Sequence, residues 1–380
     1  MSDYHQLLVF TDGNAYDPST WSNVPYMFVT AFSSQFPDIS VHTCDIRVNN
    51  FIIRAISKLY NKIFTPLLGK LCTFNRTNFY SYLVYKKMQK AVDALSSDSA
   101  ILLSFDFSHL LPKRERKEDC TALLCDWTIE YEIREHQKRV PTRMEEKLIR
   151  RQNKIISEAD YVTSIFPFAA KYITEKCHKP CFYSGKHKNV DKHIKIHANS
   201  NRIESNRFLF IGNKAYLPGL KIIVDAIENY NKYNPSRHIW LDVIGMTDEV
   251  GDFSRHIVFH GYLNKKNPDQ ANEYYSLIYN ARALITVSDK WVGASSIMEA
   301  MSLGTPVIIS PNKELEAMFG KDISFGWWSA ATQEDVYNAI EQSMRLTSDE
   351  LKHMCESASS ELSGCDWESL VYRWAKNIGI

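Results

Sequence analysis

The sequence contains no run of about eighteen or more apolar residues, so we expect no transmembrane helix. Its first residues, MSDYHQLLVFTDGN, lack the charged segment followed by an apolar segment that marks a signal peptide, and they are typical of a first strand. The eight cysteines are therefore expected to be reduced thiols of a cytoplasmic protein.

An excess of charge of one sign is also missing. The 45 Lys and Arg residues nearly balance the 44 Asp and Glu residues, so no global field attracts a polyanion. No zinc-finger, helix-turn-helix or RNA-binding aromatic motif is present, and we expect no nucleic acid partner. With 44% hydrophobic and 23% charged residues, the 380-residue chain has the composition of a globular protein and the length of two domains.

The sequence also lacks a clear set of metal ligands. Cysteines and histidines do gather in one basic stretch, at Cys177, Cys181, His187, His193 and His197. They do not separate into the clean Cys and His pairs that structural zinc sites normally use. We interpret them as half-buried thiols and solvent-exposed histidines, and we expect no metal and no bound cofactor.

Short β-type apolar runs alternate with helical patterns along the whole chain, in two series. The first series of expected strands covers residues 5–10, 39–46, 100–107, 121–127 and 160–166, with a helix over 26–36 after the first strand. The second series covers residues 207–213, 238–245, 256–262, 281–288 and 305–310. This alternation is typical of βαβ units, so we expect an α/β fold with two doubly wound Rossmann-like domains.

A polar tract from Lys186 to Asn206 separates the two series and has almost no apolar periodicity. We therefore expect an N-terminal domain over residues 1–190, a linker over 191–206 and a C-terminal domain over 207–365. Ligands of doubly wound sheets bind beyond the carboxyl ends of the strands. With two such domains, we expect the site in a cleft between them.

The segment SSIMEAMSLGTPVIIS, residues 295–310, has the features of a binding helix. Ser295 and Ser296 would cap a helix whose first free N–H groups bind phosphate readily. Glu299 follows about one turn later in an otherwise apolar pattern, and a buried carboxylate needs donors such as the hydroxyls of a ribose. A capping interaction or a surface ion pair would account for Glu299 equally well.

The same segment resembles the donor-site signature of retaining GT-B glycosyltransferases of family 4, which is Glu, seven residues, a second Glu, then Ala-x-x-x-Gly-x-Pro-Val-Ile. The likeness extends to HIVFHGYL, YYSLIYNARALITVS, RQNKIISEADYVTSIF, LCDWTIEYE and PSTWSN. The C-terminal CDWESLVYRWAKNI resembles the final helix of that family. This implies that residues 366–380 pack back on the N-terminal domain.

The resemblance implies an enzyme that moves a sugar from a UDP- or GDP-linked donor to a glycan or lipid-linked acceptor, with retained configuration and no metal. Glu299 would hold the ribose, and backbone amides from Gly293 and Ala294 to Ser296 would face the donor sugar and diphosphate. Gly13 would let the chain approach the diphosphate closely. The resemblance further implies a role in the synthesis of bacterial surface polysaccharides or glycoconjugates.

Two departures from the family pattern fall on the donor side. Trp291 stands where the first Glu of the signature belongs, so either Asp289 takes its place or Trp291 presents a flat apolar face to the sugar. Asn213 and Pro218 stand where the family often has Arg and Lys on the diphosphate. We favour Lys214 for that role.

A third departure falls on the acceptor side, where many members have a His and this chain has Asp126. The carboxylate would hydrogen-bond an acceptor hydroxyl or act as its base, or it would cap the next helix. His109, near another strand end, is a second candidate, with a satisfied loop histidine as the alternative.

Acidic residues are absent from positions 46–92, a segment that holds nine Lys and Arg residues. Arg54, Lys58 and Lys62 recur every four residues and share one face of a predicted helix. Another face carries Ile52, Ala55, Ile56, Leu59 and Ile63. Residues 47–90 would suit an anionic membrane surface, at the inner face of the membrane, or would be ordinary helices with a solvated basic face.

Two other functions are compatible with the same residues. The departures from the signature would suit a non-catalytic GT-B subunit that binds a partner or a glycan. Nucleotide-sugar epimerases share the architecture and would release an isomer or free sugar without an acceptor. Nothing in the residues indicates an oligomeric state.

Overall fold

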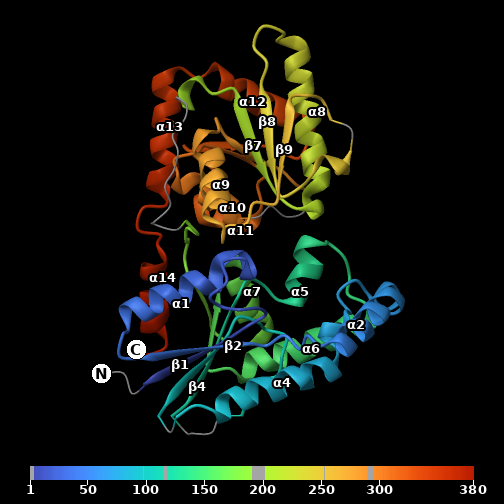
Figure 1. Ribbon diagram of the computed structural model, residues 1–380, viewed down its shortest axis with the longest axis vertical. Coiled ribbons are helices and arrows are strands. Elements are labelled where there is room, and N and C mark those ends of the chain that lie inside the picture. Colours follow the sequence, from blue (N-terminus) through green and yellow to red (C-terminus); the bar gives the residue numbers. More distant parts are fainter. Residues whose placement is uncertain (1–3, 97, 114–117, 191–201, 252, 290–293) are drawn as a thin grey trace. The chain divides into compact units, whose positions relative to one another are not determined.

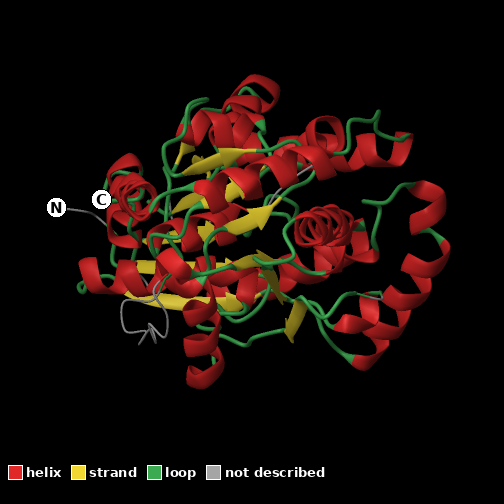
Figure 2. Cartoon of the chain, turned by 90° about the horizontal axis from the view of Figure 1, so that it is seen from above, coloured by secondary structure: helices red, strands yellow, loops and turns green. Residues whose placement is uncertain are grey.

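The computed structural model describes residues 4–96, 98–113, 118–190, 202–251, 253–289 and 294–380. The chain forms two compact units (Figure 1), an N-terminal domain of residues 1–185 and 367–380 and a C-terminal domain of residues 186–366. In both, parallel strands are joined by helices (Figure 2).

The N-terminal domain contains a six-stranded parallel sheet with the strand order β2-β1-β3-β4-β5-β6. Its strands are β1 (Gln6–Thr11), β2 (Ser40–Asp45), β3 (Ala100–Ser104), β4 (Cys120–Cys125), β5 (Tyr161–Ser164) and β6 (Cys181–Tyr183). Its α-helices are α1 (Val24–Gln35), α2 (Phe51–Ile63), α3 (Thr65–Leu68), α4 (Asn78–Asp93), α5 (Ile129–Tyr131), α6 (Arg143–Glu158), α7 (Pro167–Cys177) and α14 (Trp367–Asn377). Strands β1 and β3 are buried along their whole length, as expected for a parallel sheet covered by helices.

Different helices pack on different parts of this sheet. Leu8 and Phe10 of β1 share a core cluster with Val84 and other residues of α4. A group of aromatic side chains connects the first and the last helix of the chain. The ring centre of Phe28 in α1 lies 5.0 Å from that of Trp374 in α14. The last helix is therefore part of the core of the N-terminal domain.

The C-terminal domain contains a second six-stranded parallel sheet, with the order β12-β11-β10-β7-β8-β9. Its strands are β7 (Arg207–Ile211), β8 (Trp240–Ile244), β9 (Ile257–Gly261), β10 (Leu284–Thr286), β11 (Val307–Ile309) and β12 (Gly326–Trp328). Its α-helices are α8 (Leu217–Tyr233), α9 (Pro268–Asn280), α10 (Ala294–Ser302), α11 (Lys313–Phe319), α12 (Gln333–Arg345) and α13 (Ser348–Glu361). Residues of α8 and α12 form one core cluster with β7, β8 and β10.

Helix starts follow local capping rules in both domains. Thr142 before α6 and Thr347 before α13 each accept a hydrogen bond from the third residue of the helix, Glu145 or Glu350. Each Glu side chain accepts a hydrogen bond from the backbone N–H of its threonine in return. These capping boxes satisfy donors that the first turn of a helix leaves unpaired.

The two sheets confirm the α/β fold with two doubly wound Rossmann-like domains expected from the sequence. The sequence does not predict the edge strands β6 and β12, because they are partly exposed and lack the continuous apolar run of the equally short β10 and β11. The domain boundary lies between Gly185 and Lys186, and residues 191–201 of the expected linker fall outside the described residues. Across the described part of the chain, no helix is both long and apolar enough to cross a bilayer.

A buried network of charged groups joins three strands of the C-terminal sheet. Asp242 of β8 is 3% exposed and accepts hydrogen bonds from Arg207 of β7, at 2.7 and 2.5 Å, and from His260 of β9, at 2.8 Å. Glu273 of α9 lies 3.4 Å from the other ring nitrogen of His260. Burial favours a higher pKa for the Asp242 carboxyl, but the hydrogen bonds from His260 and Arg207 outweigh it and lower the pKa. The hydrogen bond with Asp242 raises the pKa of the His260 imidazole.

We expect His260→Gln to remove a pH-dependent part of the stability of the C-terminal domain. The pKa of His260 is higher in the folded state than its unfolded value of about 6.5, so the protonated imidazole stabilises the fold. This contribution is complete at pH values below about 6.5 and is lost as the pH rises through the folded-state pKa. Urea unfolding of the wild type should show a decline in the free energy of unfolding as pH rises above about 6.5, and His260→Gln should show less of it. The exposed His353→Gln is the control. An unchanged decline in His260→Gln would contradict the assignment.

Candidate functional site

The C-terminal sheet reverses its strand order between β7 and β10. At such a point neighbouring connections leave in opposite directions, and the loops at the carboxyl ends of the two strands leave a crevice for ligands. The loop after β7 carries Asn213 and Lys214, both exposed, and the loop after β10 carries Ser288 and the exposed Asp289. That these residues bind a donor stays a prediction.

One glycine allows these two loops to come together. A Cβ atom on Gly219, in the first turn of α8, would lie 2.1 Å from the carbonyl oxygen of Val287, the residue directly after β10. No other residue fits such a close approach of helix to strand. Just before α8, the Asn213 side chain accepts a hydrogen bond from the N–H of Ala215 and caps a short 3-10 turn.

Glu299 lies in α10 and is 2% exposed. One carboxylate oxygen accepts a hydrogen bond from Lys265 Nζ at 2.7 Å, and the other accepts one from the Tyr274 hydroxyl at 2.6 Å. Lys265 lies in the loop after β9, and Tyr274 lies in α9. The burial is tolerable because each oxygen has a donor and the charge has a counterion.

The two donors also contact each other. The Lys265 ammonium lies 4.2 Å from the centre of the Tyr274 ring and 5.4 Å from that of Tyr275. Burial and the nearby Glu299 carboxylate raise the pKa of the Tyr274 hydroxyl, which keeps it a proton donor. Sequence reasoning missed both Lys265 and Tyr274, because nothing local marks residues that meet Glu299 from 34 and 25 positions away.

The other residues predicted for the donor side do not contact the Glu299 carboxylate through hydrogen bonds or ion pairs within the described ranges. Ala294, Ser295 and Ser296 form the first turn of α10, and the Ser295 hydroxyl accepts a hydrogen bond from the Asn189 amide at 3.0 Å. Trp291 and Gly293 lie outside the described residues. Within the described ranges, no hydrogen bond or ion pair links Glu299 to Lys214 or Asp289.

The N-terminal sheet reverses its strand order between β1 and β3, and a cavity of about 580 Å³ opens there. Two carboxylates, Asp12 and Asp106, line it together with Arg76 and His109. Aromatic rings of Trp21 and Phe105 and the Cys125 thiol line other parts of it. A mixture of flat apolar walls and a few charged groups suits a polar ligand such as a sugar.

His109 is paired with a carboxylate in this cavity. Its Nε2 lies 3.2 Å from Asp106 Oδ2, and its Nδ1 is buried without a hydrogen-bond partner among the described residues. Burial raises the pKa of the nearby Asp12 carboxyl, Arg47 opposes that rise, and Asp106 adds to it. A histidine oriented by a carboxylate is a common arrangement for proton transfer.

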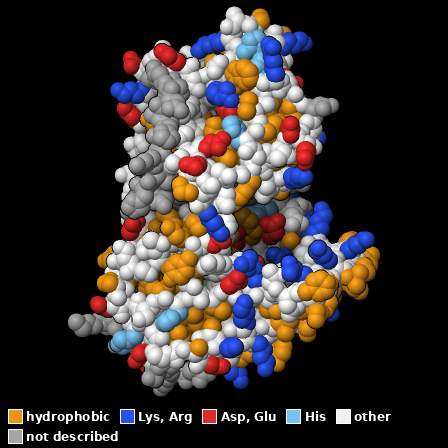
Figure 3. Space-filling model, in the orientation of Figure 1, with side chains coloured by type: hydrophobic (Ala, Val, Ile, Leu, Met, Phe, Trp, Pro, Cys, Tyr) orange, Lys and Arg blue, Asp and Glu red, His pale blue; other side chains and the backbone are white. Residues whose placement is uncertain are grey.

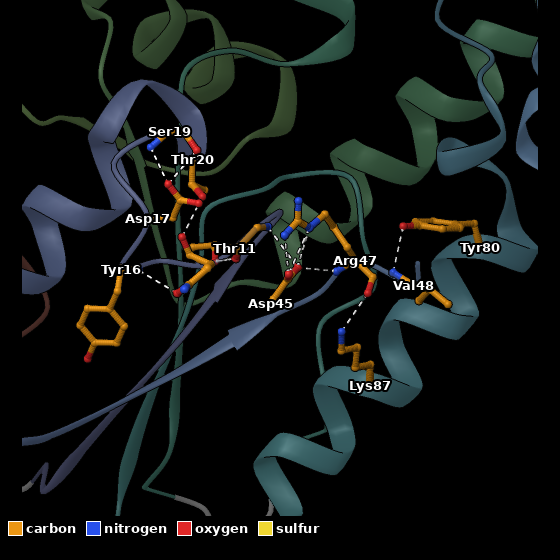
Figure 4. A network of polar contacts seen from close by, with 12 residues as sticks. Thr11, Tyr16, Asp17, Ser19, Thr20, Asp45, Arg47, Val48, Tyr80 and Lys87 are labelled. Carbon is orange, nitrogen blue, oxygen red and sulfur yellow. Dashed lines mark hydrogen bonds and ion pairs between the residues drawn. The ribbon is translucent and has the colours of Figure 1, made fainter. Parts of the chain in front are cut away.

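The loop between β1 and α1 is held by the carboxylate of Asp45 at the end of β2 (Figure 4). One oxygen accepts hydrogen bonds from the N–H of Gly13, at 3.1 Å, and from that of Arg47, at 3.0 Å, while the Arg47 guanidinium binds both oxygens. Gly13 has φ +130°, and a Cβ there would lie 2.8 Å from the Thr20 hydroxyl. The glycine is thus required by the closure of its own loop, and its contact with a diphosphate stays a prediction.

Strained backbone follows in the same loop. Trp21, Ser22 and Asn23 have φ values of 39°, 52° and 72°, all in the left-handed region. This conformation costs about 1–2 kcal/mol for each residue with a Cβ atom, although Asn tolerates it better. Such strain gathers at ligand-binding sites, and here it places the Trp21 ring at the wall of the cavity.

Asp126 follows β4, directly after the cavity residue Cys125. Its Oδ1 accepts hydrogen bonds from the N–H of Trp127 at 2.8 Å and from the Cys125 thiol at 3.1 Å. Burial raises the pKa of its carboxyl. Thr128, and not Asp126, caps α5, because its hydroxyl accepts the N–H of Tyr131.

The remaining candidates lie away from these two sites. Arg54, Lys58 and Lys62 are exposed on α2, and none of them lines the cavity. Cys177 ends α7 and Cys181 begins β6, and burial raises the pKa of the Cys177 thiol to about 11. His187 is 3% exposed, so the expectation of a solvent-exposed histidine is wrong at this position. His193 and His197 lie outside the described residues, and the described ones hold no group of three or more His, Cys, Asp or Glu fit for a metal.

No protein-family model matches the sequence, and no curated protein matches it. Solved structures do share its fold. Sucrose-phosphate synthase from Thermosynechococcus elongatus is 12% identical, with a TM-score of 0.67 over 98% of this chain and 98% of that one. TarM of S. aureus, as a mutant in complex with fondaparinux, α-GlcNAc-glycerol and UDP, is 13% identical, with a TM-score of 0.58 over 79% of this chain and 59% of TarM.

A protein of Listeria monocytogenes that was assigned as a UDP-N-acetylglucosamine 2-epimerase is also similar. It is 12% identical, with a TM-score of 0.57 over 99% of this chain and 96% of that one. This chain spans less than two thirds of TarM but nearly all of the other two. At these identities the likeness shows the fold alone, and that fold is the two-domain GT-B type.

We expect Lys265→Met to destabilise the protein by about 2–4 kcal/mol, because the buried Glu299 carboxylate loses its counterion. The double variant Lys265→Met/Glu299→Gln should recover part of the loss, with a coupling energy of at least about 1 kcal/mol in a double-mutant cycle of urea unfolding. Lys321→Met, at an exposed position of the same domain, is the control. Additive effects of the two substitutions would contradict the pairing.

Proposed function

We propose that the chain is a retaining glycosyltransferase of family 4 that moves a sugar from a UDP- or GDP-linked donor to a glycan or lipid-linked acceptor. The observation that carries the proposal is the buried Glu299 carboxylate in α10, the helix that follows β10 of a Rossmann-like sheet in a GT-B type of fold. The motif from Ser295 to Ser310 adds the family's second Glu and its Gly-Thr-Pro-Val-Ile ending. Bacterial surface polysaccharide or glycoconjugate synthesis is the pathway that the resemblance implies.

The donor nucleotide would bind at the C-terminal domain. A carboxylate offers about four acceptor positions, and Glu299 uses two of them, so ribose hydroxyls have positions left to occupy. Lys265, whose side chain is 22% exposed, would shift to admit the ribose while it stays near the negative charge. TarM, whose fold is similar, was solved in complex with UDP, which supports a uridine nucleotide here.

The chemistry requires stabilisation of the departing diphosphate. The bond between the anomeric carbon and the diphosphate oxygen breaks, and a bond from the acceptor oxygen forms on the same face of the sugar. Negative charge grows on the leaving group, and Lys214 together with the amides of Ala294 to Ser296 would offset it without a metal. Asn213, Asp289, Trp291 and Gly293 would complete the donor site.

The acceptor would enter the cavity of the N-terminal domain. Its hydroxyl proton would pass to Asp126 or to the leaving diphosphate, and the His109–Asp106 pair would orient the acceptor by hydrogen bonds. The Trp21 ring supports this use, because an aromatic face suits the apolar side of a sugar.

We expect Glu299→Ala to weaken UDP or GDP binding by at least about tenfold, because a charge-assisted hydrogen bond contributes about 1.5–3 kcal/mol. Isothermal titration calorimetry with each nucleotide measures this directly. Glu334→Ala removes an exposed carboxylate of the same domain and should leave the affinity unchanged. Equal affinities of Glu299→Ala and the wild type would remove the basis of the proposal.

Asp126→Asn should abolish the acid limb of the pH dependence of glycosyl transfer. Burial raises the pKa of Asp126, so a catalytic carboxylate there would be protonated, and activity lost, at a higher pH than an ordinary Asp allows. The measurement is kcat/KM against pH for the wild type and Asp126→Asn. An unaltered acid limb in a variant of lowered activity would exclude Asp126 as the base.

An epimerase is the second candidate, because the fold of the Listeria monocytogenes protein matches this chain over nearly its whole length. Incubation with UDP- and GDP-sugars in the absence of an acceptor separates the two. Conversion of a donor to its isomer would identify an epimerase. Binding of a donor without turnover, with any acceptor, would favour a non-catalytic subunit.

A further inference from the structure

Helices α2 and α3 present apolar side chains to solvent. Of the thirteen residues of α2, only Ile53 is buried. Phe51 is 80% exposed, Ile52 67% and Leu59 61%, and Leu67 of α3 is 77% exposed. The α2–α3 surface, as we use the term, has the exposed apolar residues Phe51, Ile52, Ile56, Leu59, Ile63, Phe64 and Leu67 and the exposed cations Arg54, Lys58, Lys62 and Lys70. An apolar group of this extent marks an interaction site.

The apolar side of α2 is not the side by which the helix joins its domain. Ile53 and Tyr60 face the core, and the Tyr60 ring lies 5.8 Å from the Phe74 ring. The Asn61 side chain accepts a hydrogen bond from the N–H of Phe74 at 2.7 Å. Residues 52, 56, 59 and 63 recur at helical spacing on a different side, so the docked helix leaves them uncovered.

Unpaired positive charge accompanies these apolar side chains. Arg54, Lys58, Lys62 and Lys70 are exposed, and within the described ranges none forms an ion pair or a hydrogen bond through its side chain. By contrast, Arg47 just before α2 is paired with Asp45. Figure 3 shows hydrophobic and basic side chains side by side where Figure 1 places α2.

We propose that the α2–α3 surface binds the anionic surface of a lipid bilayer, with its apolar side chains between the headgroups and its cations on lipid phosphates. An amphipathic helix with basic and apolar sides lies in the plane of that interface. Exposed apolar side chains next to four unpaired cations match a surface that is negatively charged at its headgroups and apolar directly beneath them. The inference is independent of the proposed glycosyl transfer.

Charge argues against a second copy of this chain as the occupant. A symmetric contact would bring the same residues together, and the segment from 46 to 92 has no Asp or Glu to face the nine cations. Like charges at an interface are strongly unfavourable.

The test is co-sedimentation of the full chain with vesicles, without any nucleotide sugar. Binding should be strong to vesicles of phosphatidylglycerol and phosphatidylcholine in equal parts and weak to phosphatidylcholine alone. Salt should weaken it, because screening acts on exposed charges. Arg54→Gln/Lys58→Gln/Lys62→Gln should lower the partition coefficient by about a hundredfold. Lys221→Gln/Lys232→Gln/Lys352→Gln, with the same loss of charge at exposed positions of the C-terminal domain, should not.

Ile52→Ser/Leu59→Ser tests the apolar part and should lower binding by at least about tenfold. Tyr233→Ser/Tyr262→Ser, at side chains 65% and 69% exposed, is its control. All four variants should keep the melting temperature of the wild type within a few degrees, since the altered side chains are exposed. Equal binding to both kinds of vesicle would overturn the proposal, as would a dimer in the ultracentrifuge that Ile52→Ser/Leu59→Ser dissociates.

Discussion

The contact of Glu299 with Lys265 and Tyr274 is the interaction on which the candidate site of the C-terminal domain depends. A carboxylate that is 2% exposed needs both of its donors, and they come from the loop after β9 and from α9. One side chain of α10 therefore positions three segments that meet only when the parallel sheet has formed. Any ligand that binds there must exchange hydrogen bonds without leaving a buried charge unpaired.

Both domains place polar groups at the point where their strand order reverses. In the C-terminal domain a glycine, Gly219, lets α8 touch the end of β10. In the N-terminal domain the loop after β1 accepts three successive left-handed residues, Trp21 to Asn23, beside the cavity. The packed cores of the sheets supply the stability against which such local strain is tolerated.

The sequence predicts the fold well because buried parallel strands are continuous apolar runs, such as LLVF in β1 and FLFI in β7. It does not predict β6 or β12, which are partly exposed edge strands without the continuous apolar run that β10 and β11 have at the same length. The spacing of the apolar residues also predicts the apolar face of α2. A helical pattern shows which residues share a face, but it does not show which face meets the core. In α2 the core-facing residues are Ile53 and Tyr60, while the apolar face stays exposed.

The sequence by itself determined the two series of βαβ units, and with them the edges at which Asn213, Lys214 and Asp289 stand. Tertiary structure alone decided what these edges hold: Lys265 and Tyr274 on Glu299, Asp45 on Gly13, and His109 beside Asp106 in a cavity with Asp12. The reason is physical. Secondary structure follows from patterns of neighbouring residues, whereas most of these contacts join side chains tens of positions apart that approach only after the strands have paired.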